Sequence, residues 1–175
     1  MPSIITHAAV PLALYAAAEH GRISPRLLVA GVVASMLPDI DVLSFALHIP
    51  YESPFGHRGA THSLLFAAFV ALAGALLAGR LRSNTWQAAA WLFVCAVSHP
   101  LLDAMTSGGL GVAIAWPWSD ARWFAPFRPI LVSPIGVGFF SARGMATLMS
   151  ELHWVWLPLF GGVALWKLIN RSGAR

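Results

Sequence analysis

The sequence predicts an all-helical membrane protein, for two main reasons. Hydrophobic residues make up 58% of the 175 residues, charged residues only 10%, and the mean hydropathy is +0.70, whereas soluble domains carry about 25% charged residues. The apolar residues are also gathered into five long segments joined by polar or proline-containing links, as in polytopic helical membrane proteins. We therefore expect one membrane-embedded domain over residues 1–175. It should have about five transmembrane helices and an interfacial or re-entrant segment at 106–150.

The first two apolar segments contain polar residues in unusual places. Residues 4–18 are apolar apart from the early His7 and Thr6, and they are short for a hydrocarbon core of roughly 30 Å, so tilt or flanking residues must complete the span. Residues 27–49 are interrupted by Asp39 and Asp41, directly after Pro38. Each aspartate costs roughly 2.5 to 3.5 kcal/mol at the centre of a membrane helix. Their presence therefore indicates a function.

The remaining three spans follow in order. Residues 63–79 form the third span and come after a loop, residues 50–62, that ends in a polar motif, HRGATH. The fourth span, residues 86–105, carries His99, Pro100 and Asp103 in its second half, and the fifth covers residues 152–169. The intervening segment 106–150 is rich in Gly, Pro and Trp. Its most apolar part is too short and too interrupted by proline to cross a bilayer.

The distribution of basic residues predicts the orientation in the membrane. One side of the five-span topology collects seven of them, against four on the other side (Arg58, Arg122, Arg128 and Arg143). The seven are Arg22, Arg26, Arg80, Arg82, Lys167, Arg171 and Arg175. By the positive-inside rule the amino terminus then faces outward. These residues flank apolar segments and form no single basic stripe, so the pI near 10.2 does not indicate a nucleic-acid partner.

All the unusual polar residues fall on the outer side in this topology. Scattered structural polar residues would be expected on both sides, so the coincidence predicts a single site. Its candidate members are His7, Asp39, Asp41, His57, Arg58, Thr61, His62, His99 and Asp103.

The spacing of these residues leaves alternatives open. His99 and Asp103 are four apart and share one helix face, where they can bind one ion or tie two helices together. Asp39 and Asp41 are two apart and diverge on a regular helix, but a break at Pro38 can aim both at one cavity. They then serve either as a metal ligand with a supporting carboxylate or as acceptors between packed helices.

The loop motif has a similar ambiguity. His57 and His62 are five apart, so they converge only if His57 lies on the loop. Arg58 can hold an anionic oxygen of a substrate, with Thr61 beside it, or can pair with an aspartate. His7 is either a ligand or a packing residue. Glu151, at the outer end of the fifth span, can join the site or be solvated, and we expect it to be solvated. We expect three other histidines, His20, His48 and His153, to be interfacial.

The candidate ligands are imidazole nitrogens and carboxylate oxygens, without a thiolate. This set suits zinc, manganese or iron, and with up to seven candidates it can hold one to three ions. Sites with several metals typically activate water for hydrolysis, most often of phosphoesters.

Five motifs in order along the chain resemble one family. They are His7, PDID at 38–41, HRGATHS at 57–63, SHPLLD at 98–103 followed by Thr106, Ser107 and Gly108, and AWPWSDARW at 115–123. Together they are similar to the membrane-bound metal-dependent hydrolases, the LexA-regulated inner-membrane hydrolases of bacteria. The histidine and aspartate four apart on a helix are more distantly similar to those of zinc-dependent phospholipase C.

This resemblance implies a metal centre, zinc first, in a multi-pass protein of the bacterial inner membrane. The implied ligands are His7, Asp39, His62, His99 and Asp103, with Asp41 and His57 as further ligands or supporting partners. We expect a hydrolase that cleaves a phosphoester of a lipid or amphipathic substrate by metal-activated water, at the outer face. Asp41 would act as general base or orient a ligand, and Arg58 would bind the anionic group. The alternatives are a small transporter or ion conduit, in which the aspartates and histidines relay ions, and a metal-binding factor without catalysis. The oligomeric state stays open.

Overall fold

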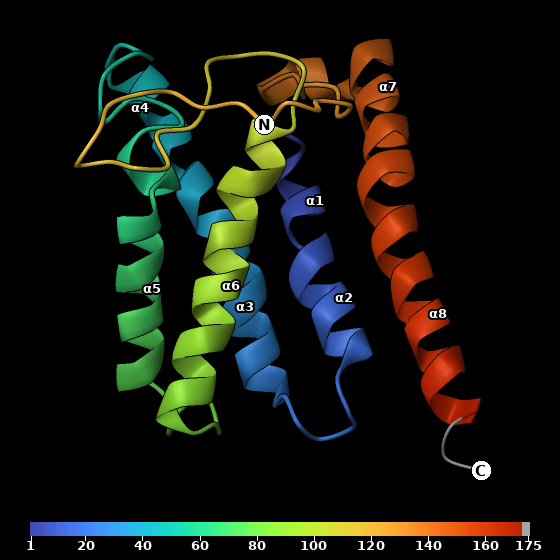
Figure 1. The fold of residues 1–175 in the computed structure, drawn as a ribbon. Coiled ribbons are helices and arrows are strands. Elements are labelled where there is room, and N and C mark those ends of the chain that lie inside the picture. Colours follow the sequence, from blue (N-terminus) through green and yellow to red (C-terminus); the bar gives the residue numbers. More distant parts are fainter. Residues whose placement is uncertain (173–175) are drawn as a thin grey trace.

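The computed structural model describes residues 1–172, which form helices and loops without a β-strand (Figure 1). Two positions in the orientation argument lie beyond this description, Arg175 entirely and the side chain of Arg171. The elements are α1 (Ile4–His7), α2 (Ala9–Ala17), α3 (Pro25–Met36), the 3-10 helix η1 (Leu37–Val42), α4 (Leu43–Ala46), η2 (Ala60–His62), α5 (Leu64–Leu76), α6 (Thr85–Ala104), η3 (Gly136–Phe140), α7 (Ala142–Glu151), the π-helical turn η4 (Leu152–Trp156) and α8 (Leu157–Ser172).

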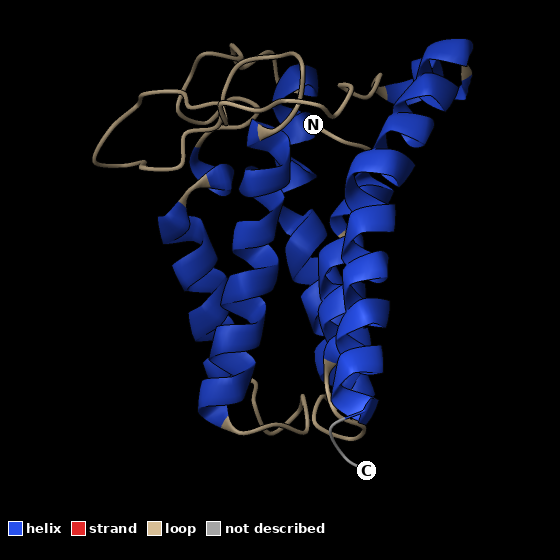
Figure 2. Ribbon diagram, turned by 45° about the vertical axis from the view of Figure 1, so that its right-hand side comes forward, coloured by secondary structure: helices blue, strands red, loops and turns tan. Residues whose placement is uncertain are grey.

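Five rods run alongside one another, and each packs on the next in the order α5, α6, α3, α2, α8. The amino terminus and the long loops, residues 47–59 and 105–135, lie at one end of the bundle (Figure 2). The short links, residues 18–24 and 77–84, lie at the other end together with the end of α8. The two sets of loops that the sequence assigns to opposite sides are thus at opposite ends of the bundle.

Small residues let the central helices approach closely. A methyl group on Gly31 of α3 would collide with the indole of Trp91 on α6, which donates a 3.0 Å hydrogen bond to the carbonyl of Leu27. A methyl group on Gly74 of α5 would lie 2.8 Å from a methyl carbon of Leu92. Such contacts are typical of helices packed in membranes, where dispersion replaces the hydrophobic effect.

The helix ends agree with the local sequence. The hydroxyl of Ser24 caps α3, with Pro25 in its first turn, and Ser63 caps α5. At Pro38 the α-helix gives way to the 3-10 helix η1, as proline cannot donate the next helical hydrogen bond. The resulting tighter turn buries both Asp39 and Asp41, in line with the predicted break at Pro38.

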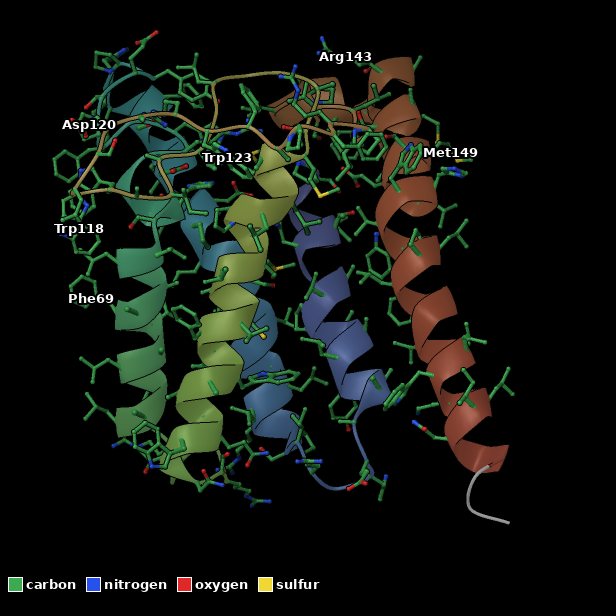
Figure 3. All side chains as sticks on the ribbon, in the orientation of Figure 1. Phe69, Trp118, Asp120, Trp123, Arg143 and Met149 are labelled. Carbon is green, nitrogen blue, oxygen red and sulfur yellow. The ribbon has the colours of Figure 1, made fainter. Side chains whose placement is uncertain are left out.

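Within the described residues 1–172, two helices are both long enough and apolar enough to cross a membrane, Pro25–Ala46 and Ala142–Asn170. Two shorter apolar helices, Ile4–Ala17 and Leu64–Leu76, agree with the predicted first and third spans. The last helix corrects one prediction, because it begins at Ala142 and not at residue 152. The segment that crosses the end of the bundle is therefore residues 105–141. Figure 3 shows Phe69 pointing away from the bundle on α5, while Asp120 and Arg143 lie at the end that carries the loops.

The buried interior differs between the two ends of the bundle. At the end with the short links the core is apolar and contains Ile23, Leu27, Ala78 and Ala88. At the opposite end the buried side chains include histidine, aspartate and arginine. The predicted gathering of polar residues at one end is therefore present in the structure.

Candidate metal centre

Four structural elements bring three histidines and two aspartates together. His7 ends α1, Asp39 lies in η1, His62 ends η2, and His99 and Asp103 lie one turn apart on α6. His7, His62, His99 and Asp103 are fully buried, and the Asp39 side chain is 2% exposed. Fully buried ionisable groups need partners, since isolation from water is costly.

Their side-chain atoms lie within a few ångströms of one another. The two Nε2 atoms of His62 and His99 are 3.0 Å apart. His62 Nε2 lies 3.3 Å from Asp103 Oδ2, and His99 Nε2 lies 3.5 Å from Asp39 Oδ1. Asp39, His62, His99 and Asp103 each offer one atom within 4.8 Å of the others and can hold a metal ion.

His7 completes this group from the amino terminus. Its Nε2 lies 3.5 Å from Asp103 Oδ1 and 4.0 Å from Asp39 Oδ2, and its ring stacks on that of His99 with centroids 3.6 Å apart. Neither of its ring nitrogens has a hydrogen-bond partner. The carboxylate oxygens of Asp39 and Asp103 likewise accept no hydrogen bond. Buried nitrogens and carboxylate oxygens without hydrogen bonds are atoms that could ligate a metal ion.

Asp41 lies behind the histidines. One oxygen is 2.6 Å from Nδ1 of His57, and the other is 3.1 Å from Nδ1 of His62 and accepts from Thr61 Oγ1 at 2.6 Å and from the Arg58 backbone N–H at 3.0 Å. Asp41 therefore contacts the side of His62 that faces away from the cluster. His99 is oriented similarly, with Nδ1 2.8 Å from the carbonyl of Ser35. Partners on Nδ1 turn Nε2 toward a metal.

His57 belongs to a second group. It lies on the loop, as its spacing from His62 required, and the two ring centroids are 5.8 Å apart. With Asp39 and Asp41 it offers atoms within 4.8 Å of one another. The structure thus brings all the predicted ligands to one region, and Asp39 is shared between the two groups.

The side chain of Arg58 makes its contacts within the protein. It is fully buried, with Nε 3.0 Å from Asp103 Oδ2. Its terminal nitrogens donate to the carbonyls of Gly108 and Leu110 at 3.2 and 2.8 Å and to the hydroxyl of Thr106 at 2.9 Å. Arg58 therefore takes the pairing alternative and holds the 106–110 loop over α6. Its predicted role in substrate binding gains no support from this geometry, and Thr61 is directed to Asp41.

The charges in this region do not balance. Asp39, Asp41 and Asp103 supply three buried carboxylates, whereas among the described side chains Arg58 supplies the one buried guanidinium. With neutral histidines, two negative charges are left over. Burial opposes protonation of His62, yet the neighbouring carboxylates of Asp103 and Asp41 outweigh this effect and raise its pKa to about 9, so that without a metal this ring would itself carry one compensating positive charge. The region therefore favours a cation.

Glu151 departs from the sequence prediction. It was expected to be solvated, but it is 1% exposed and accepts hydrogen bonds from the backbone and hydroxyl of Ser3 and from the hydroxyl of Thr6. The reason is that α7 extends the last helix past the loop end of the bundle and places Glu151 beside the amino terminus. The sequence did not reveal that Ser3 and Thr6, which shortly precede His7, are the partners of Glu151. The other histidines, His20, His48 and His153, are exposed and lie outside the cluster, as predicted.

Fold and site together define a class: an all-helical membrane protein with a buried histidine and aspartate cluster, able to hold a metal ion, at one end of an apolar bundle. The family model described as YdjM inner membrane protein matches residues 1–174, so the chain belongs to that family. The inner membrane protein YbcI of Escherichia coli (strain K12) is 46% identical over 172 residues, which cover 95% of this chain and 99% of the relative. No solved structure matches the chain. Both names support the predicted location in the bacterial inner membrane.

Proposed function

We propose that this protein is a metal-dependent hydrolase that cleaves a phosphoester of a lipid or amphipathic substrate. One observation carries the proposal: three imidazoles and two carboxylates converge in a region that, with neutral histidines, carries two more buried negative charges than positive ones. A structural role in helix packing would leave one buried negative charge uncompensated even with His62 protonated, at a cost of several kcal/mol. A divalent cation would neutralise the excess charge. Nitrogen and oxygen ligands without thiolate favour zinc, with manganese or iron as other candidates.

The residues of the cluster would have two roles, metal binding and support of the ligands. His7, Asp39, His62, His99 and Asp103 would hold the ion or ions, which when bound supply Lewis acidity and lower the pKa of water. Asp41 would keep the His62 ring in place, and His57, on the other side of Asp41, would be available for a second ion or for proton transfer.

We also propose that the chain crosses the membrane five times, through α1–α2, α3, α5, α6 and α7–α8. The support is the side-by-side arrangement of these rods and the loops at two opposite ends. The excess of lysine and arginine at the short links and the carboxyl terminus favours that end for the cytoplasm. The candidate metal centre would then face outward.

Metal analysis tests the proposal most directly. Purified wild-type protein should contain a transition metal and hydrolyse a phosphomonoester or phosphodiester, whereas His62→Ala and His99→Ala should lose both metal and activity. His153→Ala changes an exposed histidine outside the cluster and serves as the control. A wild-type protein with neither bound metal nor hydrolysis would overturn the proposal.

The same variants separate the two rival functions. A metal-binding factor without catalysis would retain metal and show no turnover on any phosphoester. An ion conduit would show liposome flux that depends on Asp39 or Asp103. The apolar packing of Ile23, Leu27 and Ala88 at the opposite end provides no polar continuation for such a path within the described residues.

A further inference from the structure

A cleft of about 400 Å³ opens beside the candidate metal centre. Its walls are Met1 and residues 3–5 of the amino terminus, Asp39 and Val42 of η1, and residues 133–136, 139 and 140 of the crossing segment. The lining side chains are apolar apart from Ser3, Ser133 and Asp39. The cleft therefore combines an apolar interior with a single acidic group, and its size falls in the range of roughly 300–1,000 Å³ usual for ligand sites.

Asp39 connects the cleft to the cluster. Its Oδ1 lies 3.5 Å from His99 Nε2, its side chain is 2% exposed, and neither of its oxygens accepts a hydrogen bond. A second apolar groove, of about 330 Å³, meets the same aspartate on α3 and η1, and Ile4 lines both hollows. Apolar surface thus leads up to the candidate ligand from the flank of the bundle.

The loop end of the bundle is closed by a different set of contacts. The guanidinium of Arg122 donates to the carbonyls of His57, Tyr51 and Ser53 at 3.1, 3.1 and 2.9 Å. Arg58 holds the 106–110 loop from beneath. These bonds fasten the 50–62 loop to the crossing segment above the cluster. A substrate that approached from the aqueous side would have to break them.

The cleft rim, in contrast, is apolar and open. Ile4, Ile5 and Ile135 are 49%, 53% and 52% exposed, and Phe140 is 90% exposed. In a membrane protein such side chains contact lipid rather than water. A molecule with a long hydrocarbon chain can therefore enter from the bilayer without exposing that chain to water.

We infer that the cleft binds the hydrocarbon chain of a long-chain lipid phosphate and presents its phosphoester to the cluster at Asp39 from the membrane side. This assignment rests on the proposed function and specifies its substrate class. The apolar walls bind the chain, and a cation held by the cluster would bind the phosphate. Chain length should therefore decide affinity, whereas a short-chain phosphate with the same head group should bind poorly.

Photolabelling of the full-length protein tests the assignment without requiring turnover. The probe is hexadecyl phosphate with a diazirine at the chain end, added to protein in vesicles of phosphatidylcholine together with zinc. Labelled peptides should come from residues 1–5 and 133–140. Unlabelled hexadecyl phosphate should compete, and butyl phosphate and inorganic phosphate should not.

Two matched variants test whether the labelling depends on the cleft. Ile135→Trp fills the cleft and should reduce labelling about tenfold. Val137→Trp adds the same side chain two residues away, at a position that is 92% exposed and does not line the cleft, and should leave labelling unchanged. Equal labelling of both variants, or labelling spread over the outer faces of α5 and α8, would refute the assignment.

The outcome is separable from that of the proposed function. Saturable, chain-length-dependent labelling without hydrolysis would support the cleft assignment and remove the catalytic proposal. Hydrolysis of butyl phosphate and hexadecyl phosphate at equal efficiency, with diffuse labelling, would support catalysis and overturn the assignment.

Discussion

Asp41 shows at the scale of one residue how a buried carboxylate can act through its neighbours. It contacts His57, His62, Thr61 and the backbone of Arg58, while the proposed ligand atoms lie on the far side of His62. We predict that Asp41→Asn lowers zinc affinity about 10 to 100-fold, since the amide no longer favours the Nδ1–H form of both histidines. Zinc titration of the purified variant measures this. Asp120→Asn, at an exposed loop position, should keep wild-type affinity.

The buried ion pair between Arg58 and Asp103 is a second feature at the scale of single residues. Replacing it with methionine leaves Asp103 without its guanidinium partner and frees the carbonyls of Gly108 and Leu110. Removing one member of a buried pair costs about 3–5 kcal/mol. We expect a clear decrease in the thermal unfolding temperature of Arg58→Met, and no change in Arg143→Met, where the side chain is exposed. If Arg58→Met retained full stability but lost substrate affinity, Arg58 would instead bind substrate.

At the scale of elements, α7 holds the amino terminus in place. Glu151 accepts hydrogen bonds from Ser3 and Thr6, and the indole of Trp156 donates to the Thr6 hydroxyl at 3.0 Å. His7 follows on the same turn. The amino-terminal part of the last helix thus supports His7, a proposed ligand that is 144 residues earlier in the chain (151 minus 7).

This arrangement predicts the effect of Glu151→Gln. Each hydrogen bond to a charged group contributes about 1.5–3 kcal/mol, so the variant should lose hydrogen-exchange protection at residues 3–7 and bind zinc more weakly. Hydrogen exchange with mass spectrometry measures the first effect and metal titration the second. Glu19→Gln removes an exposed carboxylate that pairs with Arg22 and is the control. Unchanged protection would mean that helix packing alone fixes the amino terminus.

At the scale of the whole molecule, the proposed topology predicts which end of the bundle faces outward. Asp120 lies at the loop end of the bundle (Figure 3), and the link of residues 18–24, which contains Glu19, lies at the opposite end (Figure 1). Both side chains are exposed. The native Cys95 is fully buried and should react little. A membrane-impermeant thiol reagent should therefore label Asp120→Cys in intact spheroplasts and Glu19→Cys only after the membrane is opened. The reverse pattern would place the candidate metal centre on the cytoplasmic side.

Much of the candidate site was predictable because polar residues in an apolar chain are conspicuous. His7, Asp39, His62, His99 and Asp103 stand out against the apolar background, and a topology with alternating loops places them on one side. The break at Pro38 and the loop position of His57 also follow from local stereochemistry. The gathering of polar residues on one side required only composition, periodicity and spacing, whereas the choice of these five residues as ligands came from the family resemblance.

Other features depend on contacts between distant segments. The burial of Glu151 arises because the last helix begins at Ala142 and passes beside the amino terminus. The pairing of Arg58 with Asp103 depends on how the loop folds over α6. Neither contact has a signature in the neighbouring sequence, so local patterns favoured solvation for Glu151 and left two roles open for Arg58.

The sequence by itself determined the class of protein, the residues of the candidate metal centre and the end of the bundle that holds them. It could do so because burial of a charge in an apolar chain is costly, so ionisable residues within apolar segments indicate a function. Only the tertiary structure decided which charges neutralise one another, which carboxylate lies behind the histidines, and that an apolar cleft reaches Asp39 from the side. Those features are set by distances between segments far apart in the chain, and residue spacing carries no information about them.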